Sequence, residues 1–166
     1  MIFETHKVGE LIVNFDSKRK PLSSLEREKK KGKYPYYGAT QIFDYIDDYI
    51  FDGEYILLGE DGTVINSDGS PVLQLAKGKF WVNNHAHVLR NSELIDFNYL
   101  YYRLKSTNFS SAVTGAVQPK ISQANLYAIE IKIAANIADQ RKIASVLLAI
   151  DKKINIKNAI NDNLAA

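Results

Sequence analysis

The sequence NIADQRKIASVLLAIDKKINIKNAINDNLAA occupies residues 136–166 and contains neither glycine nor proline. Asn136 can cap a helix there, with Asp139 three residues later in the position of a capping box. Beyond this cap, apolar residues recur at alternating spacings of four and three, which is the spacing of one helix face. The stripe comprises Ile143, Leu147, Ile150 and Ile154, with Val146, Ile160 and Leu164 beside it. The pattern predicts a long C-terminal helix.

The length of this helix leads to a second expectation. About 24 residues extend for about 36 Å, which is more than a small domain can cover. We therefore expect part of the apolar face to pack against a partner helix. The alternative is a helix that packs entirely on its own domain. Lys153 and Lys157 interrupt a strict heptad, which argues against a long regular coiled coil.

Residues 34–90 are punctuated by turn signals at Asp52-Gly53, Asp61-Gly62 and Asp68-Gly69. The segments around these turns are rich in aromatic and β-branched residues, which strands prefer. The strand candidates are Ile42 to Phe51, Tyr55 to Leu58, Val72 to Leu75, Phe80 to Val82 and Ala86 to Leu89. The region therefore predicts a compact, mainly antiparallel β unit.

Helical and strand patterns follow this unit. Asp96 to Lys105 has apolar residues at a helical period, Ser122 to Tyr127 predicts a helical turn, and residues 129–133 alternate as in a strand. We predict an α+β fold in two parts. A mixed, mainly antiparallel β domain spans residues 1–135, and the helix of residues 136–166 follows it.

Composition restricts the class of protein. The chain has 166 residues, of which 46% are hydrophobic, and this is enough for a globular domain with its own core. The absence of cysteine excludes disulfides and thiolate metal sites and fits a reducing cytoplasm. Residues 1–13, MIFETHKVGELIV, lack the pattern of a signal peptide, and no apolar run has membrane-spanning length. We expect a cytoplasmic protein that has no membrane partner.

Charge is distributed unevenly, although the net charge is only +2. Eight lysines and arginines lie between Lys18 and Lys33, in a segment that predicts a loop with one helical turn near Leu25. Eight aspartates and glutamates and no basic residue lie between Asp44 and Asp68. The first segment predicts a basic edge that favours a polyanionic partner, and the second argues against indiscriminate coating of nucleic acid. A solvated, lysine-rich loop is the alternative.

Basic residues are mixed with aromatic and amide groups in residues 18–41. Lysine and arginine neutralise phosphates, whereas tyrosine, asparagine and glutamine bond to phosphates or base edges. The candidate DNA contacts are Lys18, Arg19, Lys20, Lys29, Lys30, Lys31, Lys33, Tyr36, Tyr37, Gln41, Asn83, Asn84, His85, Gln118 and Lys120. For the tyrosines, core packing with a bonded hydroxyl is an equal alternative.

The sequence lacks the motifs of common enzymes. It has no methyltransferase motif of the form Asn/Asp-Pro-Pro-aromatic, no phosphate-binding Gly-Lys-Ser/Thr loop and no Gly-x-Ser-x-Gly elbow. His85 and His87 would share a strand face, as zinc ligands can, but no further ligand motif accompanies them, which favours a structural role. Glu130-Ile131-Lys132 has the form of a nuclease strand, with Asp52 or Glu54 as upstream carboxylates. Outward-facing charges on a strand are the favoured interpretation, and we predict no catalytic, cofactor-binding or metal-binding residue.

Five segments, in order, resemble the successive motifs of type I restriction-modification specificity subunits. The resemblance covers nearly the whole chain, from about Val8 to Ile156. The segments are KRKPLSSLEREKKKGKYPYYGAT (18–40), YIFDGEYILLGEDGTV (49–64), GKFWVNNHAHVLR (78–90), GAVQPKIS (115–122) and ADQRKIASVLLAIDKKI (138–154).

The resemblance implies a non-catalytic target recognition domain that grips one half of a split double-stranded DNA target. It also implies a helix that pairs with a second such helix in an antiparallel coiled coil. The implied partners are methyltransferase subunits, which bring S-adenosylmethionine, and restriction subunits, which bring ATP and magnesium; the chain itself would hold no cofactor.

Members of this family usually contain two recognition domains and two helices, whereas this chain has one of each. We therefore expect a homodimer that reads an interrupted palindrome. The residues predicted to hold it together are Ile143, Val146, Leu147, Ile150, Ile154 and Ile160. The alternatives are a small magnesium-dependent nuclease and an interaction protein that does not bind DNA.

Overall fold

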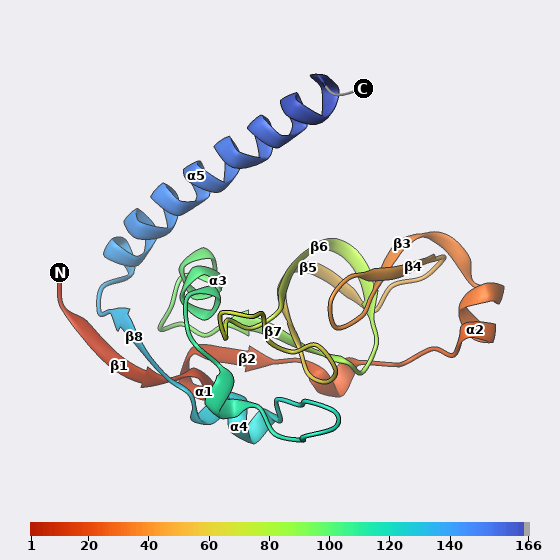
Figure 1. Ribbon diagram of the computed structural model, residues 1–166, viewed down its shortest axis with the longest axis horizontal. Coiled ribbons are helices and arrows are strands. Elements are labelled where there is room, and N and C mark those ends of the chain that lie inside the picture. The colour runs from red at the N-terminus through yellow and green to blue at the C-terminus, as the bar shows by residue number, and fades with distance from the viewer. Residues whose placement is uncertain (165–166) are drawn as a thin grey trace.

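The larger of two β-sheets forms the centre of the protein in the computed structural model, which describes residues 1–164 (Figure 1). Its six strands lie in the order β2-β7-β5-β6-β3-β4. All neighbours are antiparallel except β3 and β6, which are parallel. The strands are β2 (Ile12–Asn14), β3 (Lys31–Tyr37), β4 (Ile42–Ile46), β5 (Phe51–Gly59), β6 (Leu73–Val82) and β7 (Ala86–Asn91).

The smaller sheet joins the start of the chain to the segment before the last helix. Strand β1 (Phe3–Lys7) pairs antiparallel with β8 (Glu130–Ala134), so that Phe3 lies opposite Ala134. Strand β8 confirms the strand expected at residues 129–133. Strand β1 was not predicted, because its residues FETHK are mostly polar and exposed and carry no apolar alternation.

Helices surround the sheets, and side-chain caps fix where several of them begin. Ser23 and Glu26 form a reciprocal capping box at α2, and Asp96 accepts hydrogen bonds from the first turn of α3. The helices are α1 (Val8–Leu11), α2 (Ser24–Lys29), α3 (Phe97–Lys105), α4 (Gln123–Ala128) and α5 (Ile137–Leu164), with short 3-10 turns η1 (Asp16–Lys18) and η2 (Ser110–Ala112).

The core divides into two main parts. Leu58 of β5 and Leu89 of β7 pack with Leu100 and Leu104 of α3 in the larger part. In a second cluster, Phe51 of β5 and Phe80 of β6 stack with ring centroids 5.2 Å apart and pack with aliphatic residues of β5, β6 and β7. Apolar burial of this extent stabilises a domain of this size without disulfides or metals.

The predicted α+β class is confirmed, but two predicted strand boundaries are wrong. The segments Val72 to Leu75 (from Leu73 onward) and Phe80 to Val82 belong to one continuous strand, β6, because Lys77-Gly78-Lys79 keeps its pairing with β5. This stretch is exposed and polar, with Gly78 at a φ of +73°, and it resembles a turn in the sequence. The segment Ile42 to Phe51 is instead two strands, because β4 ends at Ile46 and Asp47-Asp48 lie in the turn before β5.

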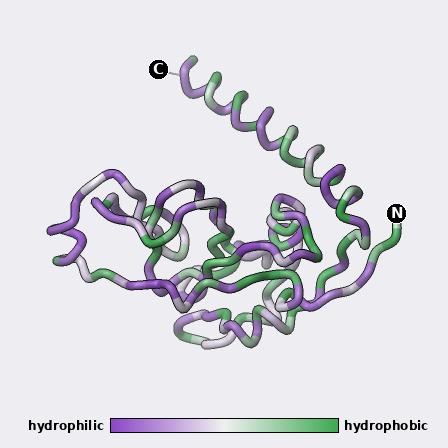
Figure 2. Tube along the Cα trace, turned by 180° about the vertical axis from the view of Figure 1, so that it is seen from behind, coloured by the Kyte–Doolittle hydropathy of each residue, from purple (hydrophilic) through white to green (hydrophobic). Residues whose placement is uncertain are grey.

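Helix α5 contacts the domain along its first half and then extends away from it (Figures 1 and 2). Its 28 residues extend for about 42 Å. Gln140 and Ala144 are buried, whereas Val146, Ile150, Ile154 and Ile160 are 48–60% exposed. The helix therefore does not pack entirely on its own domain, and the packing of its uncovered apolar face against a partner helix stays a prediction. Residues 165–166 of the predicted segment lie outside the described residues.

Two residues of the predicted dimer stripe face their own domain instead. Ile143 packs against the larger core, and Leu147 is half-buried. Ile143 and Leu147 lie seven residues before Ile150 and Ile154, respectively. This spacing predicts a shared helix face, but it does not predict where the helix separates from the domain. Helix α5 also packs against α3, and these contacts reach as far along α5 as Asp151. The Asp151 carboxylate accepts a 2.8 Å hydrogen bond from the Tyr102 hydroxyl.

Gln140 fixes the junction between α5 and the domain. Its side-chain oxygen accepts a hydrogen bond from the Asp96 amide, and its amide group donates to the carbonyls of Ala134 and Leu94. The helix is therefore joined by buried polar contacts to β8 and to the start of α3. None of the helices within residues 1–164 is both long and apolar enough to cross a membrane.

Candidate nucleic-acid interface

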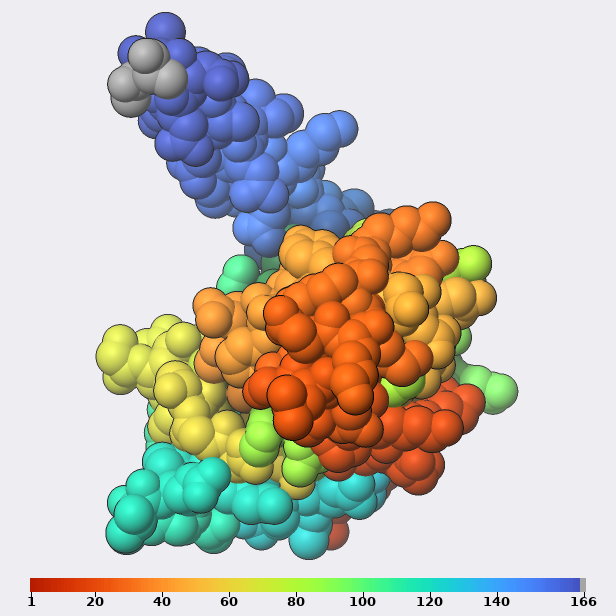
Figure 3. Space-filling view, turned by 90° about the vertical axis from the view of Figure 1, so that its right-hand side faces the viewer, coloured from red at the N-terminus to blue at the C-terminus, as the bar shows by residue number. Residues whose placement is uncertain are grey.

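Four loops meet around Glu60, at the end of β5. The Glu60 carboxylate accepts a 2.6 Å hydrogen bond from Arg19 and lies 3.2 Å from the Lys120 ammonium. Its backbone N–H donates to the carbonyl of His85, and its carbonyl accepts from Ile121. We call residues 15–23, 60–63, 83–85 and 113–121 the loop cluster. Its yellow, lime and teal segments lie together on one face of the molecule, below the orange residues that precede β5 (Figure 3).

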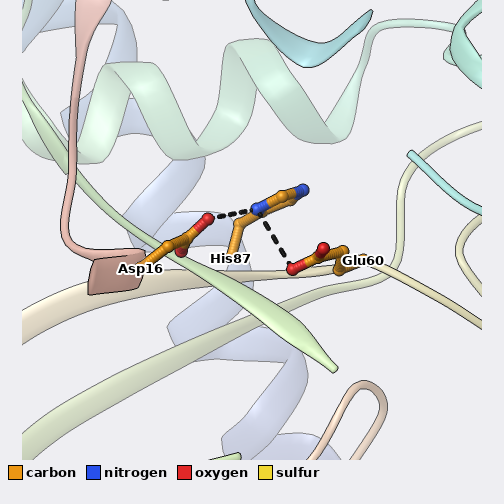
Figure 4. Close-up of side chains that lie close together, drawn as sticks. All are labelled: Asp16, Glu60 and His87. Atoms are coloured by element: carbon orange, nitrogen blue, oxygen red, sulfur yellow. Dashed lines mark hydrogen bonds and ion pairs between the residues drawn. The ribbon is translucent and has the colours of Figure 1, made fainter. Parts of the chain in front are cut away.

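A buried polar network holds the loop cluster from beneath (Figure 4). The fully buried His87 imidazole lies with Nδ1 2.6 Å from Asp16 and Nε2 2.8 Å from the carbonyl of Ile121. Asp16 also accepts hydrogen bonds from the Val88 amide and from Gln123. These contacts join η1, β7, α4 and Ile121, two residues before α4, and so they fix the loops relative to one another.

The Asp16 carboxylate remains charged in the interior of the protein. Burial acts to raise the pKa of Asp16, but the hydrogen bond and the charge of His87, together with the Val88 and Gln123 donors, lower it to about 2. Both ring nitrogens of His87 lie against oxygen atoms, Nδ1 against Asp16 and Nε2 against the carbonyl of Ile121. The network therefore provides partners for polar groups that would otherwise be buried without them.

Asp16, Glu60 and His87 also bring three potential metal ligands within 4.8 Å of one another. Their atoms are already engaged: Asp16 by His87, Val88 and Gln123, and Glu60 by Arg19. A cation would have to displace these donors and lie beside the Arg19 guanidinium. The arrangement fits an internal ion-pair network rather than a metal centre.

Three predicted DNA contacts lie in the interior. Tyr36 is 1% exposed and its hydroxyl accepts from the Leu22 amide. Asn83 is buried, and its side-chain oxygen accepts from the His85 amide. The Arg19 side chain is 12% exposed and donates to Glu60 and to the carbonyls of Asn84 and Ala86. We correct these three assignments, because their polar atoms serve the fold.

Part of the predicted basic edge is neutralised. Antiparallel pairing of β3 with β4 brings the basic segment against the acidic one. Lys31 binds Asp44 at 2.9 Å, and Lys30 lies within 4 Å of Asp47 and Asp48. Charge runs that are separate in the sequence therefore partly cancel in the fold.

The other predicted contacts remain at the surface, in two groups. Lys18, Lys20, Asn84, His85, Gln118 and Lys120 belong to the loop cluster, and Lys29, Lys33, Tyr37 and Gln41 lie on α2, β3 and the turn after β3. A surface hollow lined by Leu22, Arg27, Phe43, Asn84 and His85 borders the first of these groups. Tyr37 is only half-buried, and it packs edge-on against Phe80.

The residues of the nuclease alternative are not assembled. Asp52 and Glu54 lie on β5 of the six-stranded sheet, where Glu54 pairs with Lys77 at 2.8 Å. Glu130 and Lys132 lie on β8 of the other sheet and are exposed, as expected for outward-facing charges. His85 and His87 each contact a different carboxylate, Asp61 and Asp16, in keeping with the structural role favoured from the sequence.

Comparison with known proteins explains this arrangement of loops and helix. A family model described as the type I restriction modification DNA specificity domain matches residues 3–166. The chain belongs to this family.

Individual members of the specificity-domain family agree with this assignment. The chain is 38% identical over 132 residues to a putative type I restriction enzyme specificity subunit of Haemophilus influenzae, covering 80% of the chain and 33% of that protein. It is 25% identical over 138 residues to the type I restriction enzyme EcoprrI specificity subunit of Escherichia coli, covering 83% of the chain and 32% of that protein. The chain thus spans about a third of the length of these relatives.

The specificity-domain fold is also found among solved structures. The S subunit of a type I restriction-modification system from M. genitalium superimposes with a TM-score of 0.76 at 19% identity. The match covers 93% of this chain and 40% of the solved chain. The likeness includes the α+β domain together with the long C-terminal helix.

Proposed function

We propose that the chain reads one half of a split DNA target for a type I restriction-modification system and has no catalytic activity of its own. The observation that carries the proposal is the loop cluster. It presents lysines beside polar side chains on a rigid base, the combination that phosphate contact and base readout require. Methyltransferase subunits would supply S-adenosylmethionine, and restriction subunits would supply ATP and magnesium chemistry.

We further propose that two copies pair through α5. The exposed Val146, Ile150, Ile154 and Ile160 offer an apolar surface that the domain leaves uncovered. A helix of about 42 Å is slightly longer than one turn of B-DNA, about 34–36 Å, which is a suitable separation for two half-sites. Two identical domains related by a two-fold axis would read an interrupted palindrome.

The decisive experiment is coexpression with the cognate methyltransferase subunit, followed by genome-wide mapping of methylated adenines. The expected result is one interrupted palindromic motif. A motif with two different halves would contradict the homodimer but not DNA reading. Absence of any new methylated motif, with the methyltransferase subunit present and folded, would favour an interaction protein that does not bind DNA.

The lysines without an ion-pair partner within residues 1–164 are expected to set the salt dependence of DNA binding. Replacing Lys18, Lys20 and Lys29 with alanine should make the slope of log K against log salt concentration less steep by roughly 2–3, at about 0.9 per lost phosphate contact. The measurement is a titration of a target duplex at several salt concentrations.

The matched control for these lysines replaces Lys105, Lys142 and Lys152, on α3 and α5, with alanine. The control removes the same charge away from the loop cluster and should leave the slope unchanged. An equal change of slope in both triple variants would show that net charge, and not the position of these lysines, governs binding.

A further inference from the structure

We infer that His85 contacts a base in the DNA half-site and that Asp61 is its positioning residue. The inference rests on the proposed function and identifies a specificity-determining side chain within it. His85 lies at the tip between β6 and β7, and its side chain is 46% exposed. Its Nδ1 lies 2.6 Å from Oδ1 of Asp61, whose side chain is 19% exposed.

The carboxylate determines which tautomer the imidazole adopts. Asp61 accepts a hydrogen bond from the Nδ1–H group, so in the neutral ring Nε2 is left as a hydrogen-bond acceptor. No protein group within residues 1–164 hydrogen-bonds to Nε2. In the major groove, an outward acceptor matches the amino groups N6 of adenine and N4 of cytosine, whereas guanine and thymine present acceptors at those positions. The geometry therefore favours adenine or cytosine opposite His85.

The backbone around His85 is held rigidly, as base readout requires. The His85 N–H donates to Asn83 Oδ1 at 2.8 Å, and its carbonyl accepts from the Glu60 N–H at 2.8 Å. The backbone of Asp61 is held in turn, because it pairs with the backbone of Lys120 in an isolated antiparallel β-bridge. One hydrogen bond of this pairing runs from the Gly62 amide to the carbonyl of Pro119. The imidazole is thus positioned before any DNA arrives.

The surrounding charges permit the approach of a polyanion. Glu60, the carboxylate next to Asp61 in the chain, is compensated by Arg19 and Lys120. Lys18 and Lys20 are exposed on the neighbouring loop, where the carbonyl of Lys20 is fixed by a hydrogen bond from the Trp81 indole. Phosphates on either side of the contacted base would therefore meet lysines.

The test compares methylated motifs in cells that coexpress the methyltransferase subunit with the full chain or its variants. His85→Ala is expected to make one position in each half-site degenerate. The purified complex should lose roughly tenfold in affinity for the target duplex and less than about twofold for a scrambled duplex. Asp61→Asn should relax the same position while leaving the melting temperature near that of the wild type.

The control is His6→Ala, which removes a histidine on β1, outside the loop cluster. It should change neither the motif nor the affinities. An unchanged motif in His85→Ala overturns the inference and leaves the proposed function standing. Equal losses for target and scrambled duplexes also overturn it, because they would identify His85 as a phosphate contact. A wild-type chain that produces no motif would refute the proposed function itself.

Discussion

Asp16→Ala is expected to lower the free energy of unfolding by about 3–5 kcal/mol. The substitution leaves the buried His87 imidazole without its carboxylate partner and deprives the Val88 amide and the Gln123 side chain of their acceptor. Domains of this size have a total stability of about 5–15 kcal/mol, so the variant should be marginally folded. Urea unfolding at neutral pH, followed by circular dichroism, measures the difference.

The matched control is Asp47→Ala, because Asp47 is exposed and its nearest cation, Lys30, is 3.9 Å away. It should cost less than about 1 kcal/mol. The network also predicts a pH dependence. The pKa of Asp16 is about 2 in the fold against 3.8 ordinarily, so the stability that it contributes is present above pH 4 and lost as the pH falls toward 2.

Asp16→Asn has no carboxyl group to titrate at this position. The difference in unfolding free energy between wild type and Asp16→Asn should therefore decrease by roughly 2 kcal/mol as the pH falls from 4 to 2. A gap that stays constant, or an Asp16→Ala variant as stable as Asp47→Ala, would show that the buried pair does not stabilise the fold.

Replacing Ile150 and Ile154 with lysine is expected to convert a dimer into folded monomers. Both side chains are about half exposed and lie on the part of α5 that the domain does not cover, so the substitutions should spare the domain itself. In a pair of antiparallel helices they place up to four like charges in one apolar seam, and we expect the dimer dissociation constant to rise by more than about a thousandfold. Sedimentation equilibrium over a concentration series measures this change.

Asn155→Lys is the control for the dimer surface, because Asn155 is exposed but is not three or four residues from Val146, Ile150, Ile154 or Ile160, so it lies on another side of the helix. It should leave the association unchanged. Persistence of the dimer in the double variant, together with its loss in Asn155→Lys, would place the contact on another face of α5.

Sequence patterns among near neighbours predicted the helices and strands. Contacts between residues distant in sequence determined the arrangement of the loop cluster. The spacing of apolar residues in α5 and the alternation at Ile131 and Ile133 depend only on near neighbours, and both elements were predicted. The pairing of Asp16 with His87 joins residues 71 apart, and no local pattern reveals it. One signal was present: His87 is a polar residue between the apolar Ala86 and Val88 in the first half of β7, which favours a buried partner.

The candidate DNA contacts fall into exposed and buried residues for the same reason. Lys18 and Gln118 were placed at the surface by loop composition, and they are exposed. Arg19 has the same character in sequence as its neighbours Lys18 and Lys20, yet it turns inward, because Glu60 lies there, 41 residues further along the chain. A charge count along the sequence cannot separate a lysine that meets solvent from an arginine that completes an internal ion pair.

The contacts of α5 with the domain determine which part of the long helix can bend. The Gln140 hydrogen bonds hold its start, and the hydrogen bond from Tyr102 holds it at Asp151, so the residues from Asp151 to Leu164 project for about 20 Å. A bend of about 10° at Asp151 would move the far end by about 3.4 Å, close to the rise of a single base pair. In a dimer, the number of base pairs between the two half-sites would therefore depend on how stiffly the contacts between α3 and α5 hold the helix.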